Sequence, residues 1–124
     1  MEIEVSVGEI VDKLSILQIK TEKITDVIKL QNVTKEYLYL HEIVFAKLNI
    51  SREDQYSKLL DVNRELWDIE DKIRDKERNK EFDSEFIELA RSVYFTNDKR
   101  AEIKKEINLK YDSTFVEEKS YNPY

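Results

Sequence analysis

The chain has 124 residues, the length of a single domain, with no cysteine and one histidine. This excludes a disulfide scaffold, a cysteine-ligated zinc or iron–sulfur centre, thiol catalysis and any site that needs two histidines. A single glycine and a single proline argue against a β-sandwich or barrel, which needs turn residues at each corner. The 21 basic and 27 acidic residues give a net charge of −6, so we expect no broad electrostatic binding of nucleic acid.

Apolar residues recur at spacings of three and four along most of the chain, which predicts helices. N-capping residues mark where these helices begin: Ser6, Asp26 and Ser51, and then Asp83 or Ser84. The predicted helices cover residues 7–24, 27–48, 52–78 and 84–110, between an extended arm (residues 1–6) and a tail (residues 111–124).

The predicted helices are long and the breaks between them are short, so consecutive helices should run antiparallel. We therefore expect one all-α domain over residues 1–124, an antiparallel helical hairpin or coiled-coil bundle of about four helices. The tail either packs back on the bundle or pairs with the arm as a short strand at residues 114–116.

A polar stripe runs beside the apolar seam of the 52–78 helix. Glu70 and Glu77 fall close to the centre of that seam when residues are placed at about 100° per position. Burying an unpaired carboxylate costs several kcal/mol, and Arg74 lies one turn after Glu70. The stripe is therefore either a buried ion pair beside a packed Trp67 or the wall of a polar pocket.

A second polar anomaly lies on the 84–110 helix, where Asn97 falls in the middle of the inner face. An inward asparagine is either a register device of a helical bundle or part of a site. If the last two helices form a hairpin, Asn97 lies near Trp67 and Glu70. The candidate ligand-binding cluster then consists of Asn63, Trp67, Glu70, Arg74, Arg91, Tyr94, Asn97 and Asp98.

The first two helices carry apolar residues on two sides. Ile16 and Ile19 lie opposite Leu14 on the first, and Val27 and Leu38 lie away from the main seam of the second. Such a helix is sandwiched either within the fold or against another subunit. A homodimer is the simplest way to cover both helices, so we expect self-association.

Two acidic pairs, Glu65 with Asp68 and Glu85 with Glu88, resemble the two acidic motifs of the all-α nucleotide pyrophosphohydrolases. Magnesium takes carboxylate oxygens together with substrate phosphates. However, the first pair falls on the solvent side of its helix, whereas that chemistry needs inward carboxylates. We therefore expect no metal and no cofactor.

His41 lies between the two apolar stripes of the 27–48 helix, and we interpret it as a packed residue with a hydrogen-bonded ring.

Several strings of the sequence are similar to one family: Val5–Lys13, Asn63–Arg74, Phe86–Asn108 and Glu117–Tyr121. They resemble a family of small proteins of unknown function found in bacteria and their phages. The resemblance implies that some members are encoded near sugar-transfer and surface-polysaccharide genes. It brings no assigned catalytic residues, but its motif includes the polar candidates and Arg100, which favours a shared polar site.

Functions of different classes stay open. The preferred one is a non-enzymatic protein-interaction or adaptor module that self-associates as a homodimer. The alternative is a small-ligand binder or metal-dependent enzyme acting on a phosphorylated or nucleotide-type metabolite. There, Glu70 and Glu77 would be acid/base or metal groups, and Arg74 and Arg91 would hold the anion. A purely structural oligomer is the third.

The N-terminus lacks the basic and long apolar regions of a signal peptide, and no apolar run approaches the length of a membrane span. We therefore expect a cytoplasmic protein without membrane contact, in the host cytoplasm if a phage encodes it.

Overall fold

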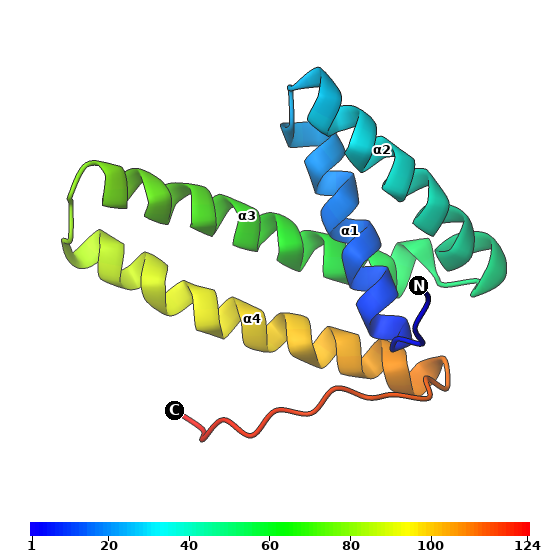
Figure 1. Ribbon diagram of the computed structural model, residues 1–124. Coiled ribbons are helices and arrows are strands. Elements are labelled where there is room, and N and C mark those ends of the chain that lie inside the picture. The colour runs from blue at the N-terminus through cyan, green and yellow to red at the C-terminus, as the bar shows by residue number, and fades with distance from the viewer.

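A computed structural model describes all 124 residues and contains four α-helices and no strand (Figure 1). The all-α prediction is therefore confirmed. The elements are α1 (Val7–Lys23), α2 (Val27–His41), two short π-helical segments η1 (Glu42–Lys47) and η2 (Arg52–Tyr56), α3 (Ser57–Arg78) and α4 (Ser84–Lys110). None of these helices is both long and apolar enough to cross a membrane.

Side-chain caps fix where the helical segments begin. Ser6 Oγ accepts the backbone N–H of Glu9 at 3.3 Å, and Asp26 accepts that of Lys29 at 2.9 Å. Ser51 caps η2 in the same way, and Asp83, rather than Ser84, caps α4 by accepting the N–H of Phe86 at 3.0 Å. Each cap satisfies a backbone donor that the first helical turn leaves unpaired.

The corner between the second and third helices differs from the sequence expectation of a continuous helix over residues 27–48. The α-helical hydrogen bonding ends at His41, and η1 and η2 lie on either side of Asn49. Asn49 adopts a φ of 57°, a left-handed conformation that asparagine tolerates better than most residues and that ends the helix. The corner brings Val44, Ile50 and Tyr56 into the core.

The fold consists of two helical hairpins that cross, with α1 in the middle (Figure 1). α1 packs against α2 on one side and against both α3 and α4 on the other. Both of its apolar faces are therefore covered within one chain, and Ile19 is only 1% exposed. α2 packs chiefly on α1 and has no buried residue before η1.

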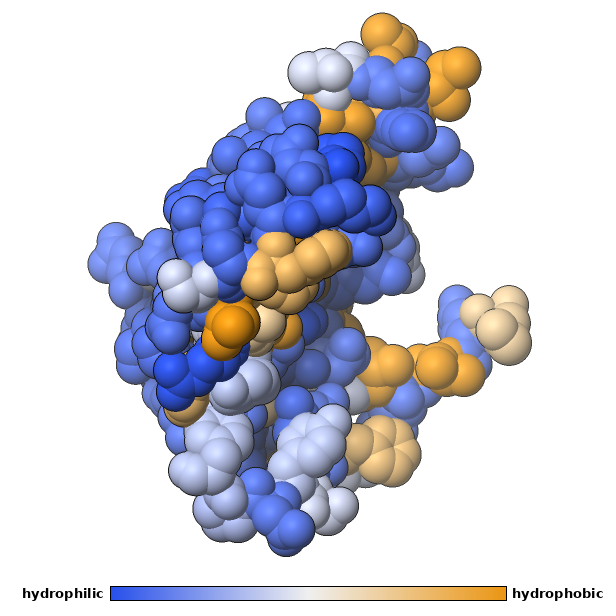
Figure 2. Space-filling model, turned by 90° about the vertical axis from the view of Figure 1, so that its left-hand side faces the viewer, coloured by the Kyte–Doolittle hydropathy of each residue, from blue (hydrophilic) through white to orange (hydrophobic).

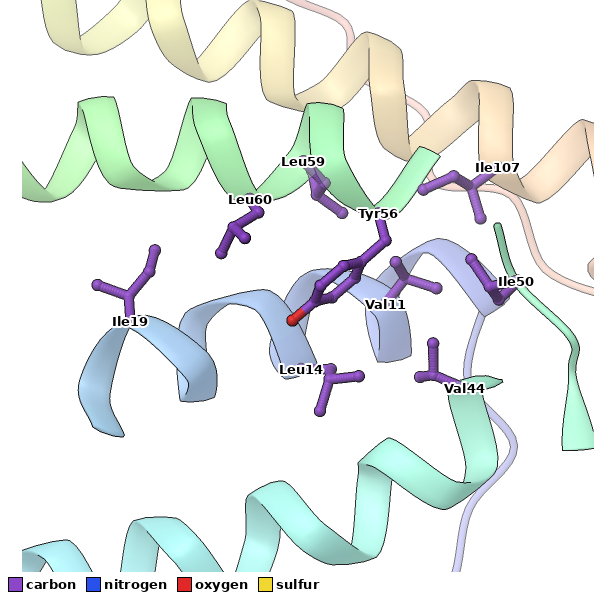
Figure 3. Close-up of a cluster of buried hydrophobic side chains, with 9 residues drawn as sticks. All are labelled: Val11, Leu14, Ile19, Val44, Ile50, Tyr56, Leu59, Leu60 and Ile107. Carbon is purple, nitrogen blue, oxygen red and sulfur yellow. The ribbon is translucent and has the colours of Figure 1, made fainter. Parts of the chain in front are cut away.

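The hydrophobic core lies where the two hairpins cross (Figure 3). Its side chains come from α1, both π-helical segments, the corner between them, α3 and the end of α4. They are Val11, Leu14, Ile19, Val44, Ile50, Tyr56, Leu59, Leu60 and Ile107. The far halves of α3 and α4 extend beyond this core and pack mainly on each other (Figure 1).

Lys76 stabilises the turn between α3 and α4 through ion pairs. Its Nζ lies 3.0–3.1 Å from the carboxylates of Glu81, Asp83 and Glu85, and hydrogen bonds to these groups raise the Lys76 pKa above its ordinary value. The left-handed φ of 54° at Lys80 closes the turn. This end of the hairpin is therefore held by charges rather than by a buried core.

The tail after Tyr111 runs back along α4 without regular secondary structure (Figure 1). It therefore packs on the bundle and forms no strand with the N-terminal arm. The two ends of the chain are linked at one point, where the Val7 N–H donates to Ser113 Oγ at 3.0 Å.

Candidate functional site

The candidate cluster lies in three separate places. Asn63 is buried and Trp67 is half-buried, packed against the core. Glu70 and Arg74 are exposed on the outer half of α3, and Arg91 is exposed on α4, where it pairs with Glu88. The remaining members lie where the tail crosses α4: Tyr94, Asn97 and Asp98.

The expectation that Glu70 and Glu77 lie close to the core is wrong, because both side chains are about half exposed. Glu70 reaches Arg74 at 3.4 Å, and Glu77 reaches Lys80 at 3.9 Å. Both pairs lie on the part of the α3–α4 hairpin that extends beyond the core. Solvent screens such pairs, so they contribute little to the fold.

We therefore expect Glu70→Gln to change the free energy of unfolding by less than about 0.5 kcal/mol, since it breaks only a solvent-exposed ion pair. Urea denaturation monitored by circular dichroism measures this directly. Asp68→Asn, at an exposed position on the same helix that forms no ion pair, is the matched control. A loss above about 2 kcal/mol would mean that Glu70 supports the fold.

A network of buried polar groups joins α1, α3 and α4. Asn63 Nδ2 donates to Asp12 Oδ1 at 2.9 Å and to Ser15 Oγ at 2.7 Å. Arg100 donates from Nε to Asp12 Oδ1 at 2.9 Å and from Nη2 to the other carboxylate oxygen. Asp12 and Ser15 are almost fully buried, so this bidentate pair satisfies a charge that would otherwise be costly.

A second group of polar contacts continues the network towards the end of α4. Lys104, 8% exposed, donates from Nζ to Glu9 at 2.9 Å and to Glu117 of the tail at 3.4 Å. Burial lowers the Lys104 pKa, but the hydrogen bond to Glu9 and the neighbouring carboxylates outweigh it and raise the pKa overall. The Gly8 N–H donates to Asn108 Oδ1 at 2.7 Å, while the buried Asn108 Nδ2 has no partner.

Sequence reasoning found only Asn63 among the residues that surround Asp12. Arg100 entered through the family motif, and the sequence analysis gave Asp12 no role. An acidic residue between Val11 and Leu14, both core positions, was the available signal, since a buried carboxylate requires a partner.

His41 lies in an aromatic stack at the end of α2. Its ring is 5.6 Å from that of Tyr37 and 4.9 Å from that of Phe45, measured between centroids. Arg52 Nη2 lies 3.0 Å from His41 Nε2, within hydrogen-bonding distance. The interpretation of His41 as a packed residue with a hydrogen-bonded ring is confirmed.

No three histidine, aspartate or glutamate side chains are arranged so that they could hold a metal ion. The acidic pairs singled out in the sequence, Glu65 with Asp68 and Glu85 with Glu88, are exposed to solvent. Glu85 is engaged by Lys76, and Glu88 by Arg91.

A cleft of about 1010 Å³ lies between α4 and the tail. From α4 it is lined by Val93, Tyr94, Asn97 and Asp98, and from the tail by Lys119 and residues 121–124. A smaller cavity of about 220 Å³ adjoins it and shares Asn97 and Lys119. The other residues of the smaller cavity include two cations of the polar network, Arg100 and Lys104. The cleft is therefore aromatic at one end and charged at the other.

Polar contacts hold the tail over this cleft. Tyr124 Oη donates to Asp98, and Lys105 pairs with Glu118 at 3.2 Å. The Tyr124 ring also packs against Tyr94 and, edge to face, against Phe95, with centroids 5.2 and 4.8 Å apart. The hydrogen bond to Asp98, with burial and the Asp98 charge, raises the pKa of Tyr124 to about 12, so this hydroxyl remains protonated at neutral pH.

The sequence of the whole chain decides its family. The model of DUF6165, a family of unknown function, matches residues 1–124. The chain belongs to this family. Its expected membership of a family of unknown function is therefore confirmed. Searches of the curated proteins and of the solved structures found no match to the chain.

Distant strings of this DUF6165 chain meet in the fold. Gly8 and Asp12 come from the opening string, Asn63 from the second, and Arg100 and Asn108 from the third. Hydrogen bonds join them in two groups across α1, α3 and α4. The polar residues that carry the resemblance thus include those that lock the helices together.

Proposed function

We propose that this DUF6165 protein is a non-enzymatic interaction module that self-associates as a homodimer through the outer face of α2. The observation that carries the proposal is the accessible surface of the chain, 8693 Å². A compact monomer of 14.9 kDa is expected to expose roughly 7,000 Å². Only 19 of the 124 residues are buried, and 15 large hydrophobic side chains are exposed.

Exposed apolar residues lie at both ends of α2 along two neighbouring lines of its surface, and exposed polar residues such as Thr34 and Lys35 lie between them. Val27 and Leu38 are 68% and 62% exposed, and Ile28 and Tyr39 are 72% and 68% exposed. The members of each pair are eleven residues apart, which places them on the same side of a helix. Figure 2 shows apolar side chains gathered at the top of the molecule, over the turn between α1 and α2.

A second copy of the chain is the occupant that best fits this face. A standard protein–protein interface removes about 800 Å² from each partner. The accessible surface exceeds that of a compact monomer of this mass by about 1,700 Å², part of which belongs to the extended arm and tail. A two-fold interface would pair the same face of α2 from each copy and remove its exposed apolar residues from water.

Sedimentation velocity at several protein concentrations tests the proposal. We expect the wild type to sediment as a dimer at about 50 μM, and Leu38→Glu to weaken dimerisation at least about tenfold, because a carboxylate would be buried in the interface. Ile87→Glu on α4, where Ile87 is 54% exposed, is the matched control and should leave the dimer intact. A monomeric wild type at this concentration, or equal weakening by both substitutions, would contradict the proposal.

The wider setting belongs to the same proposal. A dimer formed through the outer face of α2 would leave the α3–α4 hairpin free to contact a further protein partner. Cytoplasmic location and occurrence in bacteria or phages near sugar-transfer genes stay predictions.

A further inference from the structure

The cleft between α4 and the tail contains a cation without a carboxylate partner. Arg100 is engaged by Asp12, Lys104 by Glu9 and Glu117, and Lys105 by Glu118. Lys119 lines both the main cleft and the adjoining cavity and forms no ion pair within 4.0 Å. Its ammonium is therefore available to an anion that enters the cleft.

Lys104, which lines the same small cavity as Lys119, can also become available to an anion. Glu117 holds Lys104 by a long contact of 3.4 Å and belongs to the tail, whereas the contact of Lys104 with Glu9 is 2.9 Å. An entering anion can replace the Glu117 carboxylate at Lys104 while Glu9 stays bound. Glu117 thus occupies the position that the negative group of a ligand would take.

The other end of the cleft is lined by tyrosines that could bind the ring of a ligand. Tyr94, Tyr121 and Tyr124 all line it, and each tyrosine can stack on a planar or sugar ring. The amides of Asn97 and Asn122 also line it and form no side-chain hydrogen bond within the chain, so they are free to bind polar groups of such a ring. A volume of about 1010 Å³ is at the upper end of small-molecule sites, which are typically about 300–1,000 Å³.

We propose that this cleft binds a small phosphorylated ring compound, with the ring among the tyrosines, the phosphate at Lys119 and Lys104, and the tail as the lid. The inference concerns a different surface from the α2 dimer face and does not depend on it. It also differs from the sequence expectation, in which Arg74 and Arg91 hold the anion, since both of these lie outside the cleft.

Pyridoxal phosphate is a suitable probe because it combines a ring, a phosphate and an aldehyde. With the phosphate held by Lys104, the neutral Lys119 amine attacks the aldehyde carbon and forms a C=N bond with loss of water. Borohydride then delivers hydride to that carbon, and the nitrogen takes a proton from water, which leaves a stable secondary amine. Peptide mass spectrometry of the full-length protein then measures the label at each lysine.

We expect Lys119 to be labelled at least about tenfold more than Lys110 at low probe concentration, since charge-assisted binding concentrates the phosphate. Lys110 is the internal control because it lies 5.7 Å from the Tyr111 ring, much as Lys119 lies 5.8 Å from that of Tyr121, but outside the cleft. Pyridoxal without the phosphate should lose this preference. Inorganic phosphate in excess should reduce the labelling of Lys119 but not of Lys110.

Tyr94→Ala tests the ring end of the site. It should lower Lys119 labelling at least about fivefold, because a stacking partner is lost. Tyr39→Ala, which removes an exposed tyrosine of α2, should have no effect. Equal labelling of Lys119 and Lys110, equal labelling by pyridoxal, or no response to Tyr94→Ala would overturn the proposal. The oligomeric state of each variant, measured in parallel, reports on the dimer separately.

Discussion

Asp12→Ala is expected to lower the free energy of unfolding by about 3 kcal/mol, the lower end of the range for breaking a buried ion pair. The substitution leaves the Arg100 guanidinium without its bidentate partner and removes one acceptor of the Asn63 amide. Arg100 retains some contact with water, since its side chain is 29% exposed, which moderates the loss. Urea denaturation at pH 7 measures the effect.

The double variant Asp12→Ala with Arg100→Ala provides the control. Removing both partners leaves no unpaired charge, so its loss should be smaller than the sum of the two single losses. A strictly additive result would mean that the two side chains do not interact in solution. A loss below about 1 kcal/mol for Asp12→Ala alone would contradict the buried network as a support of the fold.

Gly8→Ala is expected to destabilise the protein by about 1–3 kcal/mol, the range for overpacking a well-filled interior. A Cβ at Gly8 would lie 2.6 Å from the backbone oxygen of Lys104 and 3.0 Å from Asn108 Oδ1. The first of these is a backbone atom, so α1 would have to move away from α4. Helix propensity alone predicts the opposite sign, a gain of about 1 kcal/mol.

Whether Gly8→Ala lowers or raises the free energy of unfolding therefore tests the close approach of α1 to α4. Thermal and urea unfolding of Gly8→Ala measure it, with Ser84→Ala at the exposed first position of α4 as the control. We expect the control to stay within about 0.5 kcal/mol of the wild type. A stabilised Gly8→Ala variant would show that the two helices are farther apart than described.

Local features of the fold could be predicted from the sequence because they depend on neighbouring residues. The caps at Ser6, Ser51 and Asp83 each satisfy a backbone donor three residues later, so a short pattern specifies them. The apolar seams likewise specified which faces turn inward near the crossing. Asn63 was among the candidate residues because a polar residue beside a seam is visible on the helix itself.

The other features of the fold depend on tertiary packing, because they are set by how much of each helix its neighbours cover. The placement of Glu70 and Glu77 assumed that the inner face of α3 meets a core along its whole length, whereas the outer half extends beyond the core. Arg100 is 88 residues from its partner Asp12, and no local pattern pairs them. The α4 side of the cleft was predicted in part, since Tyr94, Asn97 and Asp98 were candidates, but the tail has no periodicity that would place it along α4.

The position of α1 between the two hairpins has a consequence for biosynthesis. Val7, Gly8 and Asp12 have hydrogen-bonding partners 106, 100 and 88 residues later in the chain, and Asn63, another partner of Asp12, lies 51 residues later. While the protein is being made, α1 emerges before α2, α3 and α4, and its buried side cannot close until α4 has been made. Until then its core leucines are exposed on the ribosome, so the nascent chain is most prone to aggregation or chaperone capture before α4 is released.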